Sequence, residues 1–333
     1  MPLSKRGESG RAKLPIVISQ GEPSGIGPEV AVKAFAALDG TVKGRPLQLL
    51  GDGEVFRRAC AISRVDPKDI GGAITETAHK VRAEPGHPSP ENAGAITAAI
   101  ADGVRACMER KAAALVTAPI HKSVLTSAGF GFPGHTEYLA ALTGAKLPVM
   151  MLASHKVAPP LRVVPFTIHI ALTEIFAQLD SQKIADVGAI VLDALKIDFA
   201  CSKPRLAIAG LNPHAGEDGT MGREDAAIIA PAAAKLREQG YEVSGPLAAD
   251  SMFHDAARET YDAALCMYHD QALIPIKTLA FWTGVNVTLG LPIVRTSPDH
   301  GTALPLAGQG AANPASMIAA IEMAADIADR RGL

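Results

Sequence analysis

The chain has 333 residues, a net charge of −2 and a pI of about 6.6. This balance excludes the broad basic field that holds nucleic acid or an acidic membrane, so an anionic substrate would need local cations. Hydrophobic residues make up 48% of the chain and aromatic residues only 4%, which is typical of a helix-rich α/β protein with room for two domains.

No segment is predicted to enter a membrane. The first thirteen residues are polar and basic, without the apolar stretch of a secretory signal. No run approaches the roughly 18 apolar residues that a transmembrane helix needs. The four cysteines include no C-x-x-C pair, and a reducing compartment is the simplest location for them. We therefore expect a cytoplasmic protein.

Short apolar runs that predict strands alternate with amphipathic runs that predict helices. This alternation favours a layered α/β architecture, with a (β/α)₈ barrel as the competing topology. Domain boundaries are poorly marked, and a discontinuous domain is as plausible as two sequential ones. The expected strands lie at residues 16–19, 47–50, 113–116, 163–168, 206–213 and 263–268, and the expected helices begin near Pro28, Ser89, Ser181, Ala226 and Asn313.

Three histidines each stand where one of these apolar runs ends: His169, His214 and His269. In open α/β sheets, ligands bind beyond the carboxyl ends of the strands. Three imidazoles delivered there from distant parts of the chain could share one divalent metal ion. A single histidine at a strand end is more often a hydrogen-bonded structural residue, but the repeated pattern favours a metal site.

Other polar clusters interrupt the apolar pattern. Lys277 and Arg295 lie among apolar residues, and cations in such a setting suit a substrate that carries carboxylate or phosphate. His135, ahead of an apolar helix, could cap that helix or bind substrate, and the sequence leaves both open. The N-terminal glycine-rich loop has Val30 where a dinucleotide fingerprint needs its third glycine, so a tight turn explains it equally well.

These segments resemble the 4-hydroxythreonine-4-phosphate dehydrogenase family of vitamin B6 biosynthesis, and the resemblance covers nearly the whole chain. The motifs that carry it occur in family order, and their joint occurrence is highly specific. They are G-E-P-S-G-I-G-P-E, T-A-P-I-H-K, G-H-T-E-Y-L, L-N-P-H-A-G-E, A-D-S-M-F, Y-H-D-Q, G-V-N-V-T-L-G-L-P and R-T-S-P-D-H-G-T-A.

The first and last of these motifs also resemble the isocitrate and isopropylmalate dehydrogenases. The resemblance implies their two-domain α/β/α fold with a central cleft, and it disfavours the barrel. Residues 1–127 plus 276–333 would form a discontinuous, nucleotide-side domain. Residues 128–275 would form the second domain, which would carry the metal and substrate site and the dimer contacts.

The resemblance also implies roles for individual residues. The family's metal-ligand positions fall on the same three histidines, His169, His214 and His269. Asp250 and Asp270 match acidic positions that would orient a ligand histidine or relay the hydroxyl proton, and the sequence does not choose between these roles. The substrate-contacting positions fall on His135, Thr136, Lys277, Asn286 and Arg295, and the nucleotide loop would include His300, Gly301, Thr302 and Asn313.

The implied enzyme is a homodimer with its active site at the subunit interface. It would use NAD or NADP and one divalent cation (Zn, Co, Mg or Mn) per site. It would oxidise 4-phosphooxy-L-threonine to 2-amino-3-oxo-4-phosphooxybutanoate, which decarboxylates to 3-amino-2-oxopropyl phosphate on the way to pyridoxine 5'-phosphate. Two alternatives stay open: a paralogue acting on a sugar-acid phosphate or a dihydrodiol acid, and a catalytically silent metal- or nucleotide-binding protein.

Overall fold

The computed structural model describes residues 12–132 and 134–333. Most of the N-terminal segment that we expect not to be a secretory signal therefore lies outside the described residues. Within the described residues, no helix is long and apolar enough to cross a membrane.

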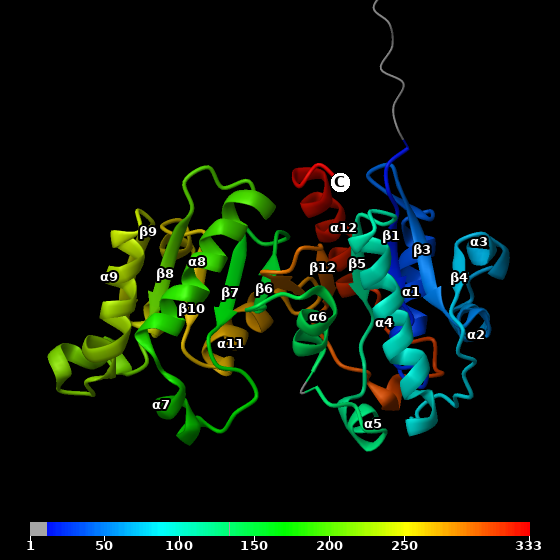
Figure 1. Ribbon diagram of the computed structural model, residues 1–333, viewed down its shortest axis with the longest axis horizontal. Coiled ribbons are helices and arrows are strands. Elements are labelled where there is room, and N and C mark those ends of the chain that lie inside the picture. Colours follow the sequence, from blue (N-terminus) through cyan, green and yellow to red (C-terminus); the bar gives the residue numbers. More distant parts are fainter. Residues whose placement is uncertain (1–11, 133) are drawn as a thin grey trace, which may run out of the picture.

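Helices pack on both faces of one twelve-stranded sheet (Figure 1). The strands are β1 (Ile16–Ser19), β2 (Thr41–Val42), β3 (Arg45–Gly51), β4 (Ile74–Glu76), β5 (Ala114–Thr117), β6 (Val149–Ser154), β7 (Leu161–Pro165), β8 (Arg205–Ala209), β9 (Glu242–Leu247), β10 (Ala263–Cys266), β11 (Val285–Leu289) and β12 (Arg295–Pro298). The α-helices are α1 (Gly27–Ala37), α2 (Gly53–Ser63), α3 (Pro67–Gly71), α4 (Ala93–Met108), α5 (Lys122–Ser127), α6 (His135–Thr143), α7 (Ile175–Gln178), α8 (Ser181–Asp198), α9 (Ala230–Glu238), α10 (Asp255–Arg258), α11 (His269–Ala280) and α12 (Ala315–Arg330).

The sheet is open, and its strands run in the order β2-β3-β1-β5-β12-β11-β6-β7-β10-β8-β9, with β4 paired to β3. Mostly parallel outer parts are joined in the middle by antiparallel pairing of β12 with β11, β11 with β6 and β6 with β7. Because the sheet has two free ends, the competing barrel topology is wrong. The layered α/β prediction is confirmed.

The expected domain division can be located on this sheet. Residues 1–127 plus 276–333 contribute every strand from β2 to β11 in the sheet order, and residues 128–275 contribute β6 to β9. The division would therefore fall between the paired strands β11 and β6, and its second boundary would cut helix α11. The division itself stays a prediction.

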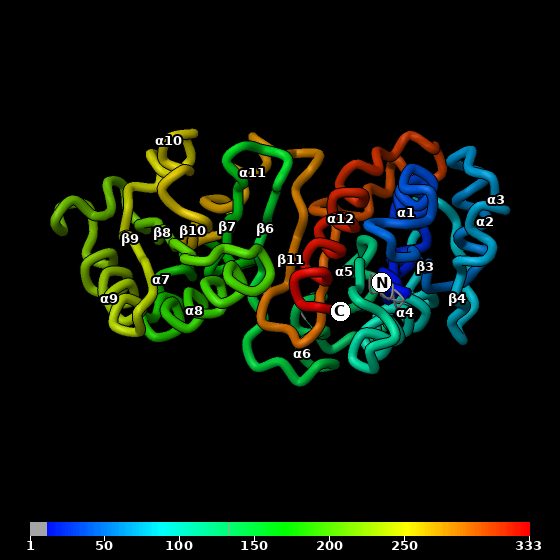
Figure 2. The backbone as a smooth tube through the Cα atoms, turned by 90° about the horizontal axis from the view of Figure 1, so that it is seen from above, coloured from blue at the N-terminus to red at the C-terminus, as the bar shows by residue number. Residues whose placement is uncertain are grey.

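One face of the sheet carries a continuous apolar core, and the other face does not. Buried residues of α1, α8 and α12 all belong to a single cluster on the first face, which spans the sheet. On the second face, α4 and α11 each cover a separate cluster, one at either end of the sheet. The sheet is twisted between its ends, so α1 and α8 lie on opposite sides in Figure 2 although they cover the same face.

The central strand β11 follows this division residue by residue. Val285 and Val287 are buried in the continuous core. Side chains alternate along a strand, so Asn286 and Thr288 point to the second face. Asn286 pairs with Ser297 of β12, which points to the same face. Polar side chains therefore gather in the middle of the second face, between the clusters under α4 and α11.

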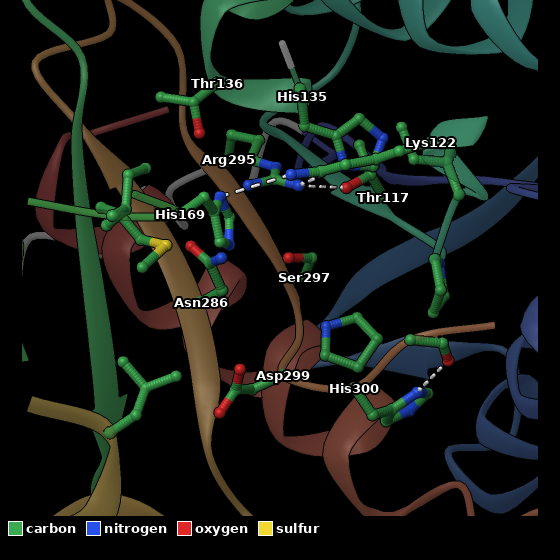
Figure 3. Close-up of a pocket in the computed structure, with 18 of the residues that line it drawn as sticks. Thr117, Lys122, His135, Thr136, His169, Asn286, Arg295, Ser297, Asp299 and His300 are labelled. Atoms are coloured by element: carbon green, nitrogen blue, oxygen red, sulfur yellow. Dashed lines mark hydrogen bonds between the residues drawn. The ribbon is translucent and has the colours of Figure 1, made fainter. Parts of the chain in front are cut away.

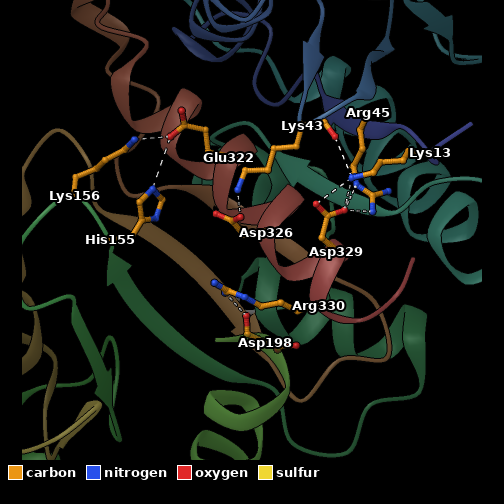
Figure 4. Close-up of polar contacts among 10 residues, drawn as sticks. All are labelled: Lys13, Lys43, Arg45, His155, Lys156, Asp198, Glu322, Asp326, Asp329 and Arg330. Atoms are coloured by element: carbon orange, nitrogen blue, oxygen red, sulfur yellow. Dashed lines mark hydrogen bonds and ion pairs between the residues drawn. The ribbon is translucent and has the colours of Figure 1, made fainter. Parts of the chain in front are cut away.

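Charged contacts of α12 fasten this helix to both parts of the sheet (Figure 4). Arg45 of β3 is only 1% exposed; its guanidinium donates to Asp329 at 2.6 Å and to the Leu333 carbonyl at 2.6 Å. At the other end of the same helix face, Lys156, which follows β6, lies 2.9 Å from Glu322. The pairs around Lys156 are partly exposed to solvent and stabilise little, whereas the guanidinium of Arg45 is itself buried and depends on its acceptors near the C-terminus.

We predict that Arg45→Ala lowers the free energy of unfolding by about 2–3 kcal/mol, because it removes a large buried side chain together with its hydrogen bonds to Asp329 and to the Leu14 and Leu333 carbonyls. Lys43→Ala is the matched control: Lys43 pairs with Asp326 of the same helix, but its side chain is 45% exposed. That change should cost less than about 0.5 kcal/mol. Urea unfolding followed by circular dichroism measures both; equal losses would contradict this role for Arg45.

Candidate active site

A cavity of about 690 Å³ lies over the polar middle of the second face. Its walls come from the segment after β5, the start of α6, the end of β7, helix α11 and strands β11 and β12 with the loop that follows (Figure 3). Most of the predicted substrate and nucleotide residues meet here. Those that line the cavity are His135, Thr136, His169, Lys277, Asn286, Arg295, His300 and Gly301.

Arg295 is a buried cation with neutral neighbours. It is 2% exposed, and its guanidinium donates to the hydroxyls of Thr288 at 2.9 Å and Thr117 at 2.6 Å. Burial lowers its pKa to about 10, so it remains charged at neutral pH. Because burying a charge without a counter-charge is costly, this arrangement indicates an anionic ligand.

His135 adds to this interpretation. Burial, then the charges of Arg295 and Lys122, hold the pKa of His135 well below its usual value. The ring is therefore neutral at physiological pH and can offer one donor and one acceptor. Its Nδ1 lies 3.3 Å from the Arg295 guanidinium.

Four buried polar atoms of cavity residues have neither a hydrogen bond nor an ion pair among the described residues: His135 Nε2, Asn286 Oδ1, Arg295 Nε and His300 Nε2. Buried polar atoms in folded proteins are nearly always bonded. Orphaned atoms around one cavity therefore point to a polar ligand that completes them.

Lys277 is already paired. Its Nζ lies 2.7 Å from Asp299 Oδ2 and also donates to the Asp299 carbonyl. This contact anchors the C-terminal part of α11 to the loop after β12. Lys277 is therefore a weaker candidate than Arg295 for neutralising a bound anion.

Lys122 is a cavity residue that the sequence reasoning did not single out. Its Nζ lies 3.4 Å from His169 Nδ1, and it adds a second positive charge to the wall that contains Arg295. The signal was present, because Lys122 ends the T-A-P-I-H-K motif, but that motif served only the family resemblance. Asp299 and Ser297, inside R-T-S-P-D-H-G-T-A, were passed over in the same way.

The three predicted metal ligands follow three neighbouring strands, since β7, β10 and β8 are adjacent in the sheet. The rings of His169 and His269 lie together, with centroids 5.6 Å apart. His214 is exposed on the turn after β8, and no group of three or more possible ligands is found in residues 12–132 and 134–333. The structure thus brings two of the three imidazoles together.

The two predicted acids lie in different settings. Asp270 Oδ1 is 2.7 Å from His269 Nδ1, a contact that leaves the Nε2 of that ring free for a ligand. This geometry favours the orienting role for Asp270. Asp250 is exposed in the short 3₁₀ turn Ala249–Ser251, which packs against the turn that carries His214.

The predicted nucleotide residues are only partly brought together. His300 and Gly301 line the cavity. Thr302 is buried behind them, where its carbonyl accepts the Ile26 amide at 3.0 Å. Asn313 lies away from the cavity wall and caps α12 through the Ala315 amide, at 2.9 Å.

Comparison with known proteins agrees with the resemblance drawn from the motifs. The family described as "Pyridoxal phosphate biosynthetic protein PdxA" matches residues 43–324. A 4-hydroxythreonine-4-phosphate dehydrogenase of Paracoccus denitrificans is 51% identical over 323 residues, covering 95% of this chain and 98% of the relative. The family prediction, and with it the prediction of a dehydrogenase-type enzyme, is confirmed.

Solved structures give the same result. The 4-hydroxythreonine-4-phosphate dehydrogenase of Klebsiella pneumoniae superposes with a TM-score of 0.81 at 35% identity, covering 95% of this chain and all of that one. A terephthalate 1,2-cis-dihydrodiol dehydrogenase of Burkholderia xenovorans superposes with a TM-score of 0.63 at 29% identity, covering 93% of this chain and 97% of that one. A β-decarboxylating dehydrogenase of Thermococcus kodakarensis superposes with a TM-score of 0.50 at 15% identity, covering 96% of this chain and 84% of that one. This last likeness shows a shared fold alone. The predicted isocitrate-dehydrogenase-like fold class is confirmed.

We predict that inorganic phosphate binds beside Arg295 and raises the melting temperature of the protein. At a hundredfold excess over its Kd, a ligand stabilises the folded state by about 2.7 kcal/mol. Arg295→Met should abolish the phosphate-dependent shift, measured by thermal unfolding with and without phosphate. Arg105→Met, which removes an exposed arginine paired with Asp102, should leave it intact. A full shift in Arg295→Met would place the anion elsewhere.

Proposed function

The chain belongs to the PdxA family of pyridoxal phosphate biosynthetic proteins, and from that premise we propose that it oxidises 4-phosphooxy-L-threonine with NAD or NADP. The product, 2-amino-3-oxo-4-phosphooxybutanoate, loses carbon dioxide to give 3-amino-2-oxopropyl phosphate, a step of vitamin B6 biosynthesis. The single observation that carries the proposal is the cavity wall beside the His169 and His269 rings, where neither Arg295 nor Lys122 forms an ion pair with a carboxylate of the described residues.

The substrate's two ends have matching partners in this cavity. Its phosphate takes the place of the missing counter-ion beside Arg295, where the neutral His135 and the hydroxyl of Thr136 can donate without adding charge. Asn286 accepts the ammonium group through its unbonded Oδ1. The hydroxyl to be oxidised then lies toward His169 and His269.

We further propose that one divalent cation is held by His169, His269 and His214. The donor set fits: His269 has Nδ1 engaged by Asp270, and burial, then Lys122 and His269, lower the pKa of His169 so that its ring stays neutral. When bound, a divalent cation lowers the pKa of a substrate hydroxyl and polarises the resulting ketone. Asp270 holds His269 in the orientation that this ligation needs.

The nucleotide is assigned to the loop that follows β12. His300 and Gly301 form the cavity wall nearest to Asp299, and burial lowers the pKa of His300, so its ring carries no charge at neutral pH. The nicotinamide supplies the hydride acceptor, which no side chain can replace. We keep the two-domain division between β11 and β6 as part of this proposal, with the cleft between the domains as the cavity.

A homodimer is supported by an exposed apolar surface beside the cavity. Ile170, Leu172 and Phe176 are 38%, 66% and 55% exposed, and next to Ile170 lies a second, mainly apolar hollow of about 440 Å³. Exposed apolar clusters of this kind mark interaction sites. A second copy that covers this surface would close the cavity from the side of His169. We place the enzyme in the cytoplasm, in keeping with its four free cysteines.

The Burkholderia xenovorans neighbour supports a second candidate, oxidation of a cis-dihydrodiol acid by the same fold. Such a substrate carries a carboxylate but no phosphate. Arg295 can hold either anion, so the substrate panel must include both.

We predict NADH or NADPH formation with 4-phosphooxy-L-threonine, and its loss on adding a chelator, followed by absorbance at 340 nm. Restoring Co²⁺ or Zn²⁺ should restore the rate. A terephthalate dihydrodiol serves as the competing substrate. Turnover of the dihydrodiol alone would replace the proposed substrate, and chelator-resistant turnover would contradict the metal.

We predict that the site takes its third imidazole from the second subunit. Because the His169 and His269 rings lie together in one chain, mixing His169→Ala with His269→Ala should restore nothing. Mixing His169→Ala with His214→Ala should give about a quarter of wild-type activity, since half of the dimers are mixed and each mixed dimer has one intact site. No recovery after verified subunit exchange would place all three ligands in one chain.

A further inference from the structure

The turn that carries His214 has a strained backbone. Residues 214–219 all have positive φ, and four of them are not glycine. His214 itself has φ 52° and ψ 28°. A side chain with a Cβ atom disfavours this left-handed conformation, and runs of it are rare. Such a turn persists only when its surroundings hold it.

A single buried carboxylate holds the entry to this turn. Asp225 is 1% exposed, and its Oδ1 accepts the Leu211 amide at 2.7 Å. Its Oδ2 accepts the Asn212 amide at 3.2 Å and the Asn212 side-chain Nδ2 at 2.8 Å. The same Nδ2 also donates to Glu224 at 2.8 Å. Asp225 thus binds both residues that lead from β8 into the turn.

The carboxylate packs closely against two glycines. A Cβ atom at Gly210 would lie 2.8 Å from Asp225 Oδ1 and 2.9 Å from the Cα of Ala215, and one at Gly216 would lie 3.3 Å from Asp225 Oδ2. The carboxylate therefore fills the space that two glycines leave between the end of β8 and the turn. It also stands first in the π-helical segment Asp225–Ile229, where the free N–H groups of a helix start favour a negative charge.

We propose that Asp225 is a positioning residue for the reaction: it keeps the left-handed turn in place and so presents the His214 imidazole for metal ligation. The role for His214 rests on the proposed function. The ring is exposed, so its position depends on the backbone beneath it. Without the carboxylate, the strained turn relaxes and the imidazole moves away from its ligating position.

The test compares Asp225→Asn with Glu224→Gln. In Asp225→Asn, an NH₂ group replaces one of the two carboxylate oxygens and cannot accept a hydrogen bond. At least one of the three bonds from Leu211 and Asn212 is therefore lost. Glu224→Gln removes the neighbouring charge on the same Asn212 side chain and leaves both backbone bonds. Three quantities are measured: hydrogen exchange of the segment 211–222 in the metal-free protein, Co²⁺ affinity from its visible spectrum, and kcat/KM.

In Asp225→Asn we expect the segment to exchange at least about tenfold faster and Co²⁺ to bind at least about tenfold more weakly, the scale of one lost hydrogen bond to a charged group. Excess Co²⁺ should recover kcat, because the ligands themselves are intact. Glu224→Gln should match wild type within about twofold. Unchanged exchange and Co²⁺ affinity in a folded Asp225→Asn protein overturn the proposal.

Two further variants separate strain from a general loss of stability. Ala215→Gly relieves one left-handed residue, so adding it to Asp225→Asn should recover part of the protection and of the Co²⁺ affinity. If Asp225→Asn does not fold, Asn212→Ala, which removes the side-chain bonds to Asp225 and Glu224 and leaves the backbone bonds, should show smaller changes in the same direction. Absence of those changes overturns the proposal as well.

The exchange measurement needs no substrate. A wild-type protein that is inactive on 4-phosphooxy-L-threonine would refute the proposed function, while the exchange and Co²⁺ comparisons would still decide the role of Asp225.

Discussion

Buried carboxylates hold several of the loops that leave the sheet, because they accept the backbone amides of these loops. A chain that leaves a buried strand carries N–H groups that must find acceptors. Glu29, 3% exposed, accepts the amides of Gly308 and Gly310. Asp225 does the same after β8. At Asp52, burial raises the pKa, but hydrogen bonds from two backbone amides outweigh it and lower the pKa overall. These acids hold in place loops that follow the strands, and the amides that they bond lie outside the cavity wall.

The sequence patterns predicted six of the twelve strands and missed the other six. All six expected strands are present, because a run buried on both faces is continuously apolar. Strand β11 was not predicted, because Asn286 and Thr288 interrupt Val285, Val287 and Leu289. That alternation is what a strand shows when one face lines a polar cavity. The helix after Ser89 begins as a 3₁₀ turn and becomes α-helical only at Ala93, a difference of hydrogen-bond register that composition does not encode.

Within the site, residue types were easier to predict than their pairing. Arg295 and Lys277 looked alike in sequence, as cations among apolar residues. In the structure, Lys277 is neutralised by Asp299, whereas the side-chain partners of Arg295 among the described residues are two hydroxyls and a neutral ring. Arg295 begins β12, whereas Asp299 follows the end of that strand and lies beside Lys277 of α11. No local sequence pattern reveals this placement. Asn313, assigned to the nucleotide loop by resemblance, caps a helix instead of lining the cavity.

The order of the strands has a consequence for biosynthesis. Strands β6 to β10 follow one another in the chain and form one end of the sheet, so they can pair as soon as they are made. In the middle of the sheet, β12 is inserted between β5 and β11 and is covered by α12, both from the last forty residues of the chain. Until these residues emerge from the ribosome, the edge of β5 that pairs with β12 in the folded protein stays unpaired, and β5 is an apolar strand. Such edges invite pairing with other chains. A premature stop before β12 would leave this edge unpaired and would therefore produce an aggregating protein rather than a shortened enzyme.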